Sequence, residues 1–190
     1  MTTSAELIEH GHGPSKQRRI NQLGLWLFFA SETFLFGAFI SSRFATTQTE
    51  TPADLNQALA LGLTTVLLLS SISAYMAETA NAHDDPRGFK IYTIATILLG
   101  ALFLGGVAVE WSEALEYFPP GTIYGTAFFS LVGLHAFHVL TGLIALLVIL
   151  FLGKEGRFGS KDSWPVEGVI KYWHFVDLAW VVIYPTLYLF

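Results

Sequence analysis

The sequence predicts an all-α membrane protein, a bundle of five transmembrane helices. Its 190 residues are 53% hydrophobic and only 13% charged, whereas a soluble domain carries about 25% charged residues. The hydrophobic residues are gathered into five blocks, each near or above the roughly 20 residues that a helix needs to cross a bilayer. Lipid offers backbone polar groups no partner, so we expect all five blocks to be helical.

The helices follow a polar N-terminal tail, residues 1–21, which has no apolar core of the kind found in signal peptides. The transmembrane domain is expected over 22–190. Its helices are expected at about 23–44, 55–77, 91–111, 124–152 and 169–190. Turn and helix-breaking residues separate them at Thr51-Pro52, Asp84 to Gly88, Pro119 to Gly121 and Gly153 to Pro165.

Basic residues are distributed unevenly between the two sides of this predicted topology. All but Arg43 fall on the side of the N-terminus: Lys16, Arg18, Arg19, Arg87, Lys90, Lys154, Arg157, Lys161 and Lys171. Because cytoplasmic loops are enriched in Lys and Arg, the N-terminus is expected in the cytoplasm and the C-terminus in the periplasm.

Composition excludes several classes of function. A net charge of −5 offers no basic face for nucleic acid. The absence of cysteine excludes disulfides, thiolate chemistry and iron–sulfur clusters. The chain also lacks a phosphate loop, a nucleotide-binding fingerprint and a nucleophile elbow.

One carboxyl group lies near the middle of a predicted span. Glu32 falls in the 23–44 helix, where a charge costs on the order of 2.5–3.5 kcal/mol on insertion scales. It must therefore hold a proton or face polar partners. A proton relay, a link to a lipid headgroup or partner subunit, and a single interhelical hydrogen bond all remain open.

Further polar residues mark the last two predicted helices. His135, His138 and Thr141 are spaced three apart on one helix, and His174 and Asp177 repeat that spacing on the next. Converging faces could bind a metal. We favour the alternative, a hydrogen-bonded network between the helices, with no metal site. A membrane metal or proton transporter is the rival of another class.

Glu110 and Glu113 end the third predicted helix, and the deeper Glu110 is expected to have a buried partner. Small residues four apart predict close helix packing. These pairs are Gly37 with Ser41, Ser70 with Ala74, and Ala101 with Gly105.

Several stretches resemble subunit III of the haem–copper oxidases. The stretch Tyr172 to Asp177 (YWHFVD), with Trp180, resembles the C-terminal signature of that family, and Gly133 to Val139 (GLHAFHV) resembles its Gly-Phe-His-Gly-Leu-His-Val segment. The remaining matches are Ser31-Glu32 with Phe34, and Glu110 and Glu113 followed by Tyr124-Gly125 and Phe128-Phe129. Val107 departs from the pattern, because the family often has glutamine there.

The resemblance implies a non-catalytic subunit of a terminal oxidase of aerobic respiration, in its short five-helix form, in the bacterial inner (plasma) membrane. In that family, haem and copper belong to partner subunits I and II, cytochrome c is the donor to the complex, and subunit III binds phospholipids and supports proton uptake. Subunit III of a quinol oxidase or of a nitric oxide reductase system is the alternative. Glu32 matches the family's intramembrane glutamate, and its interhelical polar set is matched by His135, His138, His174 and Asp177.

Overall fold

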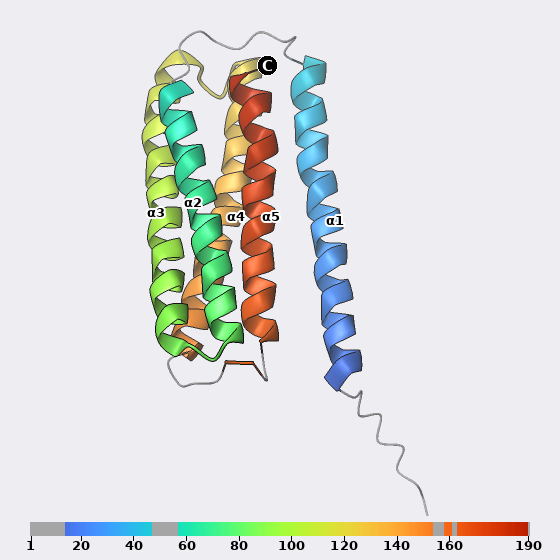
Figure 1. Ribbon diagram of the computed structural model, residues 1–190. Helices are drawn as coiled ribbons and strands as arrows, with labels where there is room; N and C mark the ends of the chain where they lie inside the picture. Colours follow the sequence, from blue (N-terminus) through green and yellow to red (C-terminus); the bar gives the residue numbers. More distant parts are fainter. Residues whose placement is uncertain (1–13, 47–56, 154–157, 161–162, 190) are drawn as a thin grey trace, which may run out of the picture.

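A computed structural model describes residues 14–46, 57–153, 158–160 and 163–189. Within these residues the chain forms α1 (Pro14–Thr46), α2 (Gln57–Ala82), α3 (Pro86–Tyr117), α4 (Ile123–Gly153) and α5 (Trp164–Tyr188). Successive helices run up and down, so the start of α1 and the C-terminus lie at opposite ends (Figure 1). The predicted all-α class and the five helices are confirmed for the described residues.

The helices extend beyond the apolar blocks. α1 begins at Pro14 rather than at residue 23, so Arg18 and Arg19 lie on a helix and not in a separate tail. Long basic side chains allow this, because their stems can lie along apolar surface while the charge reaches water. α3 begins at Pro86 because the Asp85 carboxylate caps it, accepting hydrogen bonds from the backbone of Arg87 and Gly88.

Four helices form the body of the bundle, and α1 lies beside it. α2 packs along α3, α4 packs against α3 and α5, and α5 also packs against α2. Among the described residues, α1 approaches only α4 and α5 (Figure 1). The side chains that fix α1 to the body must therefore come from those two helices.

Trp173 of α5 fills the centre of the body between two glycines. A Cβ built on Gly100 of α3 would lie 2.5 Å from its ring, and one on Gly142 of α4 would lie 2.8 Å away. The Trp173 indole N–H also donates to Ser70 Oγ of α2, at 3.0 Å. Close packing therefore uses these glycines, whereas a Cβ on Gly105 would meet nothing within 4 Å, unlike the close contact predicted there.

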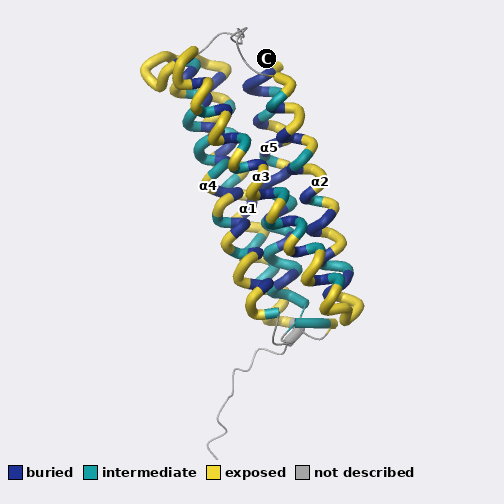
Figure 2. The backbone as a smooth tube through the Cα atoms, turned by 90° about the vertical axis from the view of Figure 1, so that its left-hand side faces the viewer, coloured by how far each residue is buried: buried dark blue, intermediate teal, exposed yellow. Residues whose placement is uncertain are grey.

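Apolar side chains cover the outside of the bundle. Figure 2 shows exposed residues along the outer sides of the helices, and these include Leu27, Phe34 and Leu98. Within the described residues, α1 to α4 are long and apolar enough to cross a membrane. α5 falls short of that measure because Lys171, His174 and Asp177 make it more polar.

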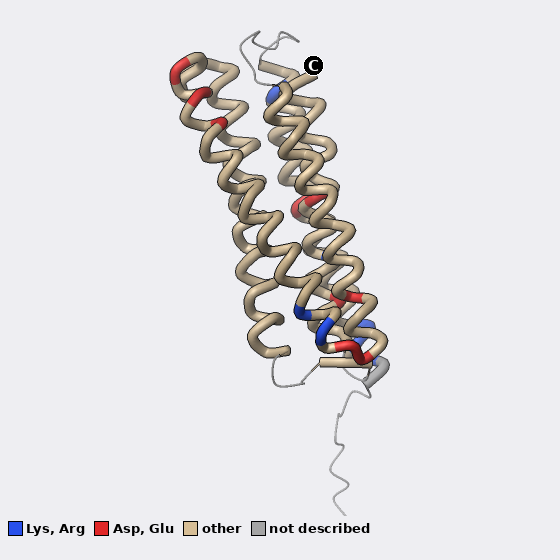
Figure 3. The backbone as a smooth tube through the Cα atoms, turned by 60° about the vertical axis from the view of Figure 1, so that its left-hand side comes forward, with Lys and Arg blue, Asp and Glu red and all other residues tan. Residues whose placement is uncertain are grey.

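The two ends of the bundle differ in charge. The described Lys and Arg residues other than Arg43 lie toward the end at which α1, α3 and α5 begin (Figure 3). At the opposite end, α3 closes with Glu110, Glu113 and Glu116. The first end thus carries most of the described positive charge.

Candidate functional site

Glu32 of α1 reaches His138 of α4. Its Oε2 atom lies 3.1 Å from His138 Nε2, and the two side chains are only 18% and 8% exposed. The ring of Phe36, one turn further along α1, lies 5.1 Å from the imidazole, centroid to centroid. A carboxyl–imidazole pair within apolar surroundings is thus the main polar contact between α1 and α4.

The geometry indicates where this pair must hold a proton. His138 Nδ1 lies 2.7 Å from the Leu134 carbonyl oxygen. Because a carbonyl can only accept, Nδ1 must carry a hydrogen. The contact between Nε2 and Glu32 then needs one further proton, on the imidazole or on the carboxyl. With one such proton, the pair is neutral overall whichever of the two groups carries it.

Thr141 and Tyr172 join the same site one turn away. The Thr141 hydroxyl and the Tyr172 hydroxyl lie 2.7 Å apart. The Tyr172 hydroxyl also donates to the His138 carbonyl oxygen, at 3.1 Å. Since the Tyr172 ring contacts Phe28 of α1, Tyr172 links α5 to both α4 and α1.

His174 faces a different helix from His138. Its Nδ1 atom lies 2.6 Å from Ser71 Oγ of α2. Among the described residues, no three His, Asp or Glu side chains come together as the ligands of a metal would. His174 and Asp177 both lie beside the Ser71 hydroxyl, whereas His138 faces Glu32 of α1.

His135 and Asp177 are the two most deeply buried members of that set, at 0% and 4% exposure. The His135 ring lies between Phe103 and Trp180, with centroid distances of 5.7 and 4.8 Å. No hydrogen bond from the described residues reaches either ring nitrogen of His135, whereas the Asp177 carboxyl has the Ser71 hydroxyl beside it. Buried polar groups normally have partners, so this polar core is incompletely paired within the described chain.

Glu110 holds the other end of the bundle together. It is 3% exposed, and its Oε1 atom accepts a hydrogen bond of 2.7 Å from the Tyr188 hydroxyl. Tyr124 donates to the Leu187 carbonyl oxygen at 2.8 Å, and the Arg43 guanidinium lies over its ring, 5.0 Å from the centroid. Glu113 is exposed.

Ion pairs join the basic ends of α1 and α5. Arg18 lies 2.7 Å from Glu167, which also pairs with Lys171. Glu167 precedes the apolar stretch of α5. Burial acts to raise its pKa, but the hydrogen bonds from Lys171 and Arg18 outweigh burial and hold that pKa below its usual value.

The sequence does not indicate which side chains would contact these groups. Ser71, Tyr172, Tyr188 and Arg43 all take part in the contacts above. A hydroxyl residue one helical turn from an ionisable residue is a sequence pattern that could predict such a partner. Thr141, three residues after His138, was predicted in this way.

Apolar helices tied together by buried carboxyl, imidazole, indole and hydroxyl groups define a polytopic helical membrane protein whose ionisable groups act between its helices. Comparison with known families places the chain within this class. The family described as cytochrome c oxidase subunit III matches residues 3–190. The chain therefore belongs to the subunit III family of the haem–copper oxidases, as the resemblance implied.

Similar proteins from several bacteria are also named as subunit 3 of an oxidase. Cytochrome c oxidase subunit 3 of Corynebacterium diphtheriae is 36% identical over 70% of this chain and 66% of its own length. Cytochrome c oxidase subunit 3 of Alkalihalophilus pseudofirmus is 32% identical over 98% of this chain and 95% of its own. Quinol oxidase subunit 3 of Bacillus spizizenii is 32% identical over 97% of both chains.

Proposed function

We propose that this chain is a non-catalytic subunit of a proton-translocating terminal oxidase, in which haem and copper chemistry takes place on partner subunits. The observation that supports this best is the Glu32–His138 pair. It can hold a proton at a largely buried position between two helices, and transfer of that proton between the imidazole and the carboxyl leaves the net charge of the pair unchanged. We propose that it supports proton uptake and protects the oxidase from inactivation during turnover.

All five helices cross the bacterial inner membrane in this proposal, with the N-terminus in the cytoplasm. The end bearing Arg18, Arg87 and Lys90 then faces the cytoplasm, in keeping with the positive-inside rule. α5 is long enough to span at 25 residues. Two of its polar groups have partners within the chain, because Lys171 pairs with Glu167 and His174 lies 2.6 Å from Ser71 Oγ of α2.

Subunit I is the proposed neighbour of the apolar outer surface. Large side chains such as Leu27 and Phe34 of α1 are 71% and 81% exposed. Lipid and a partner's helices can both cover such a surface. We propose that subunits I and II complete the complex and that phospholipids fill the rest of this surface.

Cytochrome c is the proposed electron donor to the complex. Two of the relatives above are named cytochrome c oxidase subunits. The Bacillus spizizenii relative is named a quinol oxidase subunit and supports quinol as the alternative. The donor site lies on other subunits, so contacts within this chain do not choose between the two donors.

The test is purification of the complex through a tag on this chain. We expect oxidase subunits and a haem spectrum to co-purify with the chain, with reduced cytochrome c oxidised faster than quinol. Faster oxidation of quinol would identify quinol, and not cytochrome c, as the electron donor. A tagged chain that never brings down haem, or that binds haem when isolated from every other subunit, would overturn the proposal.

A further inference from the structure

His174 of α5 reaches the surface of the bundle at the depth of the bilayer centre. It follows Trp164, the first residue of α5, by about 15 Å along the helix axis. The hydrocarbon core of a bilayer is about 30 Å thick, so His174 lies close to its middle when α5 spans the membrane. The His174 side chain is only half-buried, and its ring therefore meets whatever surrounds the bundle.

One ring nitrogen of His174 has no partner among the described residues. Nδ1 lies 2.6 Å from Ser71 Oγ of α2, whereas Nε2 makes no hydrogen bond within this part of the chain and is not enclosed by it. If the Ser71 hydroxyl donates to Nδ1, Nε2 carries the hydrogen of the neutral ring; if Nδ1 donates to Ser71, Nε2 is an acceptor. Either tautomer directs a polar atom out of the bundle.

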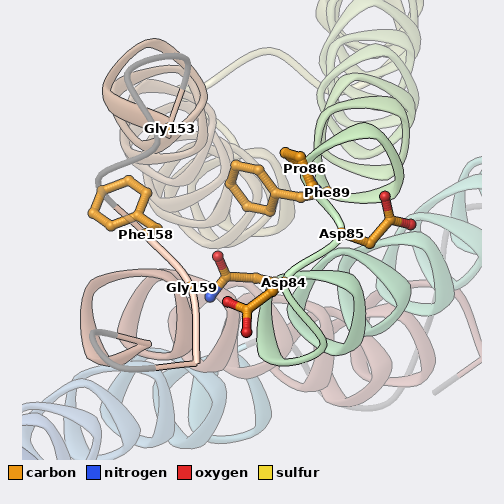
Figure 4. Close-up of a pocket in the computed structure, with 8 residues that line it drawn as sticks. Asp84, Asp85, Pro86, Phe89, Gly153, Phe158 and Gly159 are labelled. Atoms are coloured by element: carbon orange, nitrogen blue, oxygen red, sulfur yellow. The ribbon is translucent and has the colours of Figure 1, made fainter.

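A cavity at one end of the bundle does not supply the partner of Nε2. This cavity has a volume of about 220 Å³ and lies where α2 turns into α3. Figure 4 shows the rings of Phe89 and Phe158 beside the opening, together with Asp84. His174 is not among the residues that line it, so a molecule held there would not meet the imidazole.

The strip of α5 that contains His174 is open between α1 and α2 (Figure 1). Phe175 stacks on Phe29 of α1, with 4.8 Å between the ring centroids, and Ser71 of α2 lies on the other side of His174. Within the described ranges α1 approaches α5 but not α2. Leu178, one turn beyond His174, is 63% exposed, so this strip of α5 remains uncovered.

α2 adds large exposed side chains to the same side of the bundle. Leu68 and Tyr75 lie three residues before and four residues after Ser71, so they share its face of α2. Leu61 precedes Leu68 at the same seven-residue spacing, and all three of these large residues are exposed. Such spacing is typical of a helix that packs along another helix. The α2–α5 face thus consists of Leu61, Leu68, Tyr75, His174 and Leu178.

We propose that a transmembrane helix of another oxidase subunit packs on the α2–α5 face, and that a hydroxyl or carboxamide side chain of that helix forms a hydrogen bond with His174 Nε2. This inference rests on the proposed function, in which the chain assembles with partner subunits. It adds the face that one partner uses and the chemistry of its central contact.

A protein side chain suits this position better than a lipid. A phospholipid keeps its polar headgroup at the membrane surface, about 15 Å from the bilayer centre, and its acyl chains form no hydrogen bond with Nε2. A helix can carry a polar side chain to any depth, and hydroxyl and amide groups bond across membrane helices. Because these groups both donate and accept, they can pair with either tautomer of His174.

Photo-cross-linking in the purified complex tests the α2–α5 face. Leu178 of the tagged chain is replaced by p-benzoylphenylalanine, and the adducts formed on irradiation are identified by mass spectrometry. We expect a peptide from a membrane-spanning segment of another oxidase subunit. Leu98 of α3 is the matched position, because it is 64% exposed on a helix that α1 does not approach. It should not cross-link to that peptide.

Substitution of His174 tests the hydrogen bond itself. His174→Leu should roughly triple the fraction of complexes that lose the partner subunit in a detergent wash, the change that one interhelical hydrogen bond supplies. His174→Gln should retain the partner, because an amide can replace the ring nitrogen. His83→Leu is the control, since His83 is exposed at the turn after α2, and it should behave as the wild type.

The outcomes separate this inference from the proposed function. Adducts of Leu178 with lipid alone or with a second copy of this chain, or the same peptide from both positions, would overturn the α2–α5 face. Equal losses in His174→Leu and His83→Leu would overturn the hydrogen bond. The cross-link from Leu178 remains decisive if His174→Leu fails to fold. A tagged wild-type chain that brings down no oxidase subunit would instead count against the proposed function.

Discussion

Glu32 and His138 share one proton across the contact between α1 and α4, with 3.1 Å between Oε2 and Nε2. The Leu134 carbonyl, 2.7 Å from His138 Nδ1, orients the imidazole from behind. A backbone acceptor of this kind sets which ring nitrogen faces the carboxyl. α1 lies beside the bundle rather than within it, so this pair also anchors a helix that has few neighbours.

Glu32→Ala should leave the haem content of the complex intact and speed its inactivation during turnover. The haem content should not change, because haem lies on partner subunits in the proposed function. Loss of an interhelical hydrogen bond worth about 0.6 kcal/mol shifts a conformational equilibrium roughly threefold, so we expect inactivation to be faster by about that factor. The measurements are the haem spectrum and the decay of oxygen consumption. Glu32→Gln should retain the helix contact but not the transferable proton.

Glu113→Ala is the control for this prediction, since Glu113 is an exposed acid at the other end of the bundle. It should behave as the wild type in both measurements. A Glu32→Ala complex without its haem spectrum would contradict the assignment of haem to the partner subunits.

The helices could be predicted from the sequence because the bilayer imposes their length and their apolar character. The starts of α1 and α5, at Pro14 and Trp164, lie before the predicted residues 23 and 169. The sequence predicts a polar tail that includes Lys16 and Arg18, yet both residues lie on α1, where Arg18 pairs with Glu167 of α5. Such a pairing depends on helices far apart in the sequence, and no local pattern encodes it.

The polar residues could be selected from the sequence, but their partners could not. His135 and His138 are three residues apart, which separates them by about 60° around a helix. That angle turns His138 toward α1 and His135 toward Phe103 of α3 and Trp180 of α5. Rotation about the helix axis decides such neighbours, and packing of the whole bundle sets that rotation.

Gly142→Ala should destabilise the bundle. The added Cβ would lie 2.8 Å from the Trp173 ring, and overpacking of a filled core costs about 1–3 kcal/mol. Unfolding of the purified protein in a detergent titration measures the loss. Gly105→Ala, on α3, is the matched control, because its Cβ meets nothing within 4 Å. Similar unfolding of both variants would show that Trp173 does not fill this space.

Tyr188→Phe should loosen the C-terminal end of α5. It removes the hydroxyl that donates to Glu110, 2.7 Å away, and an unpaired buried acceptor costs about 1–3 kcal/mol. We expect faster proteolysis at the C-terminus and a lower unfolding midpoint. Tyr117→Phe serves as the control, because Tyr117 is 60% exposed. If the Tyr188→Phe protein were as stable as this control, the hydrogen bond between Tyr188 and Glu110 would not stabilise α5.

Glu167→Gln should lower stability only while Glu167 is ionised in the folded protein. Its folded pKa is held below the unfolded value by Lys171 and Arg18, so its contribution is present above the unfolded pKa and is lost as pH falls through the folded pKa. The contribution should be about 0.2–1 kcal/mol, because Arg18 is 52% exposed and its pairing is screened by salt. We expect the wild type and variant to differ equally at pH 6 and pH 8, and to converge below the usual carboxyl pKa of about 4.3. Detergent unfolding across this pH range measures the difference, and a gap that widened on acidification would mean that burial, not the ion pairs, governs Glu167.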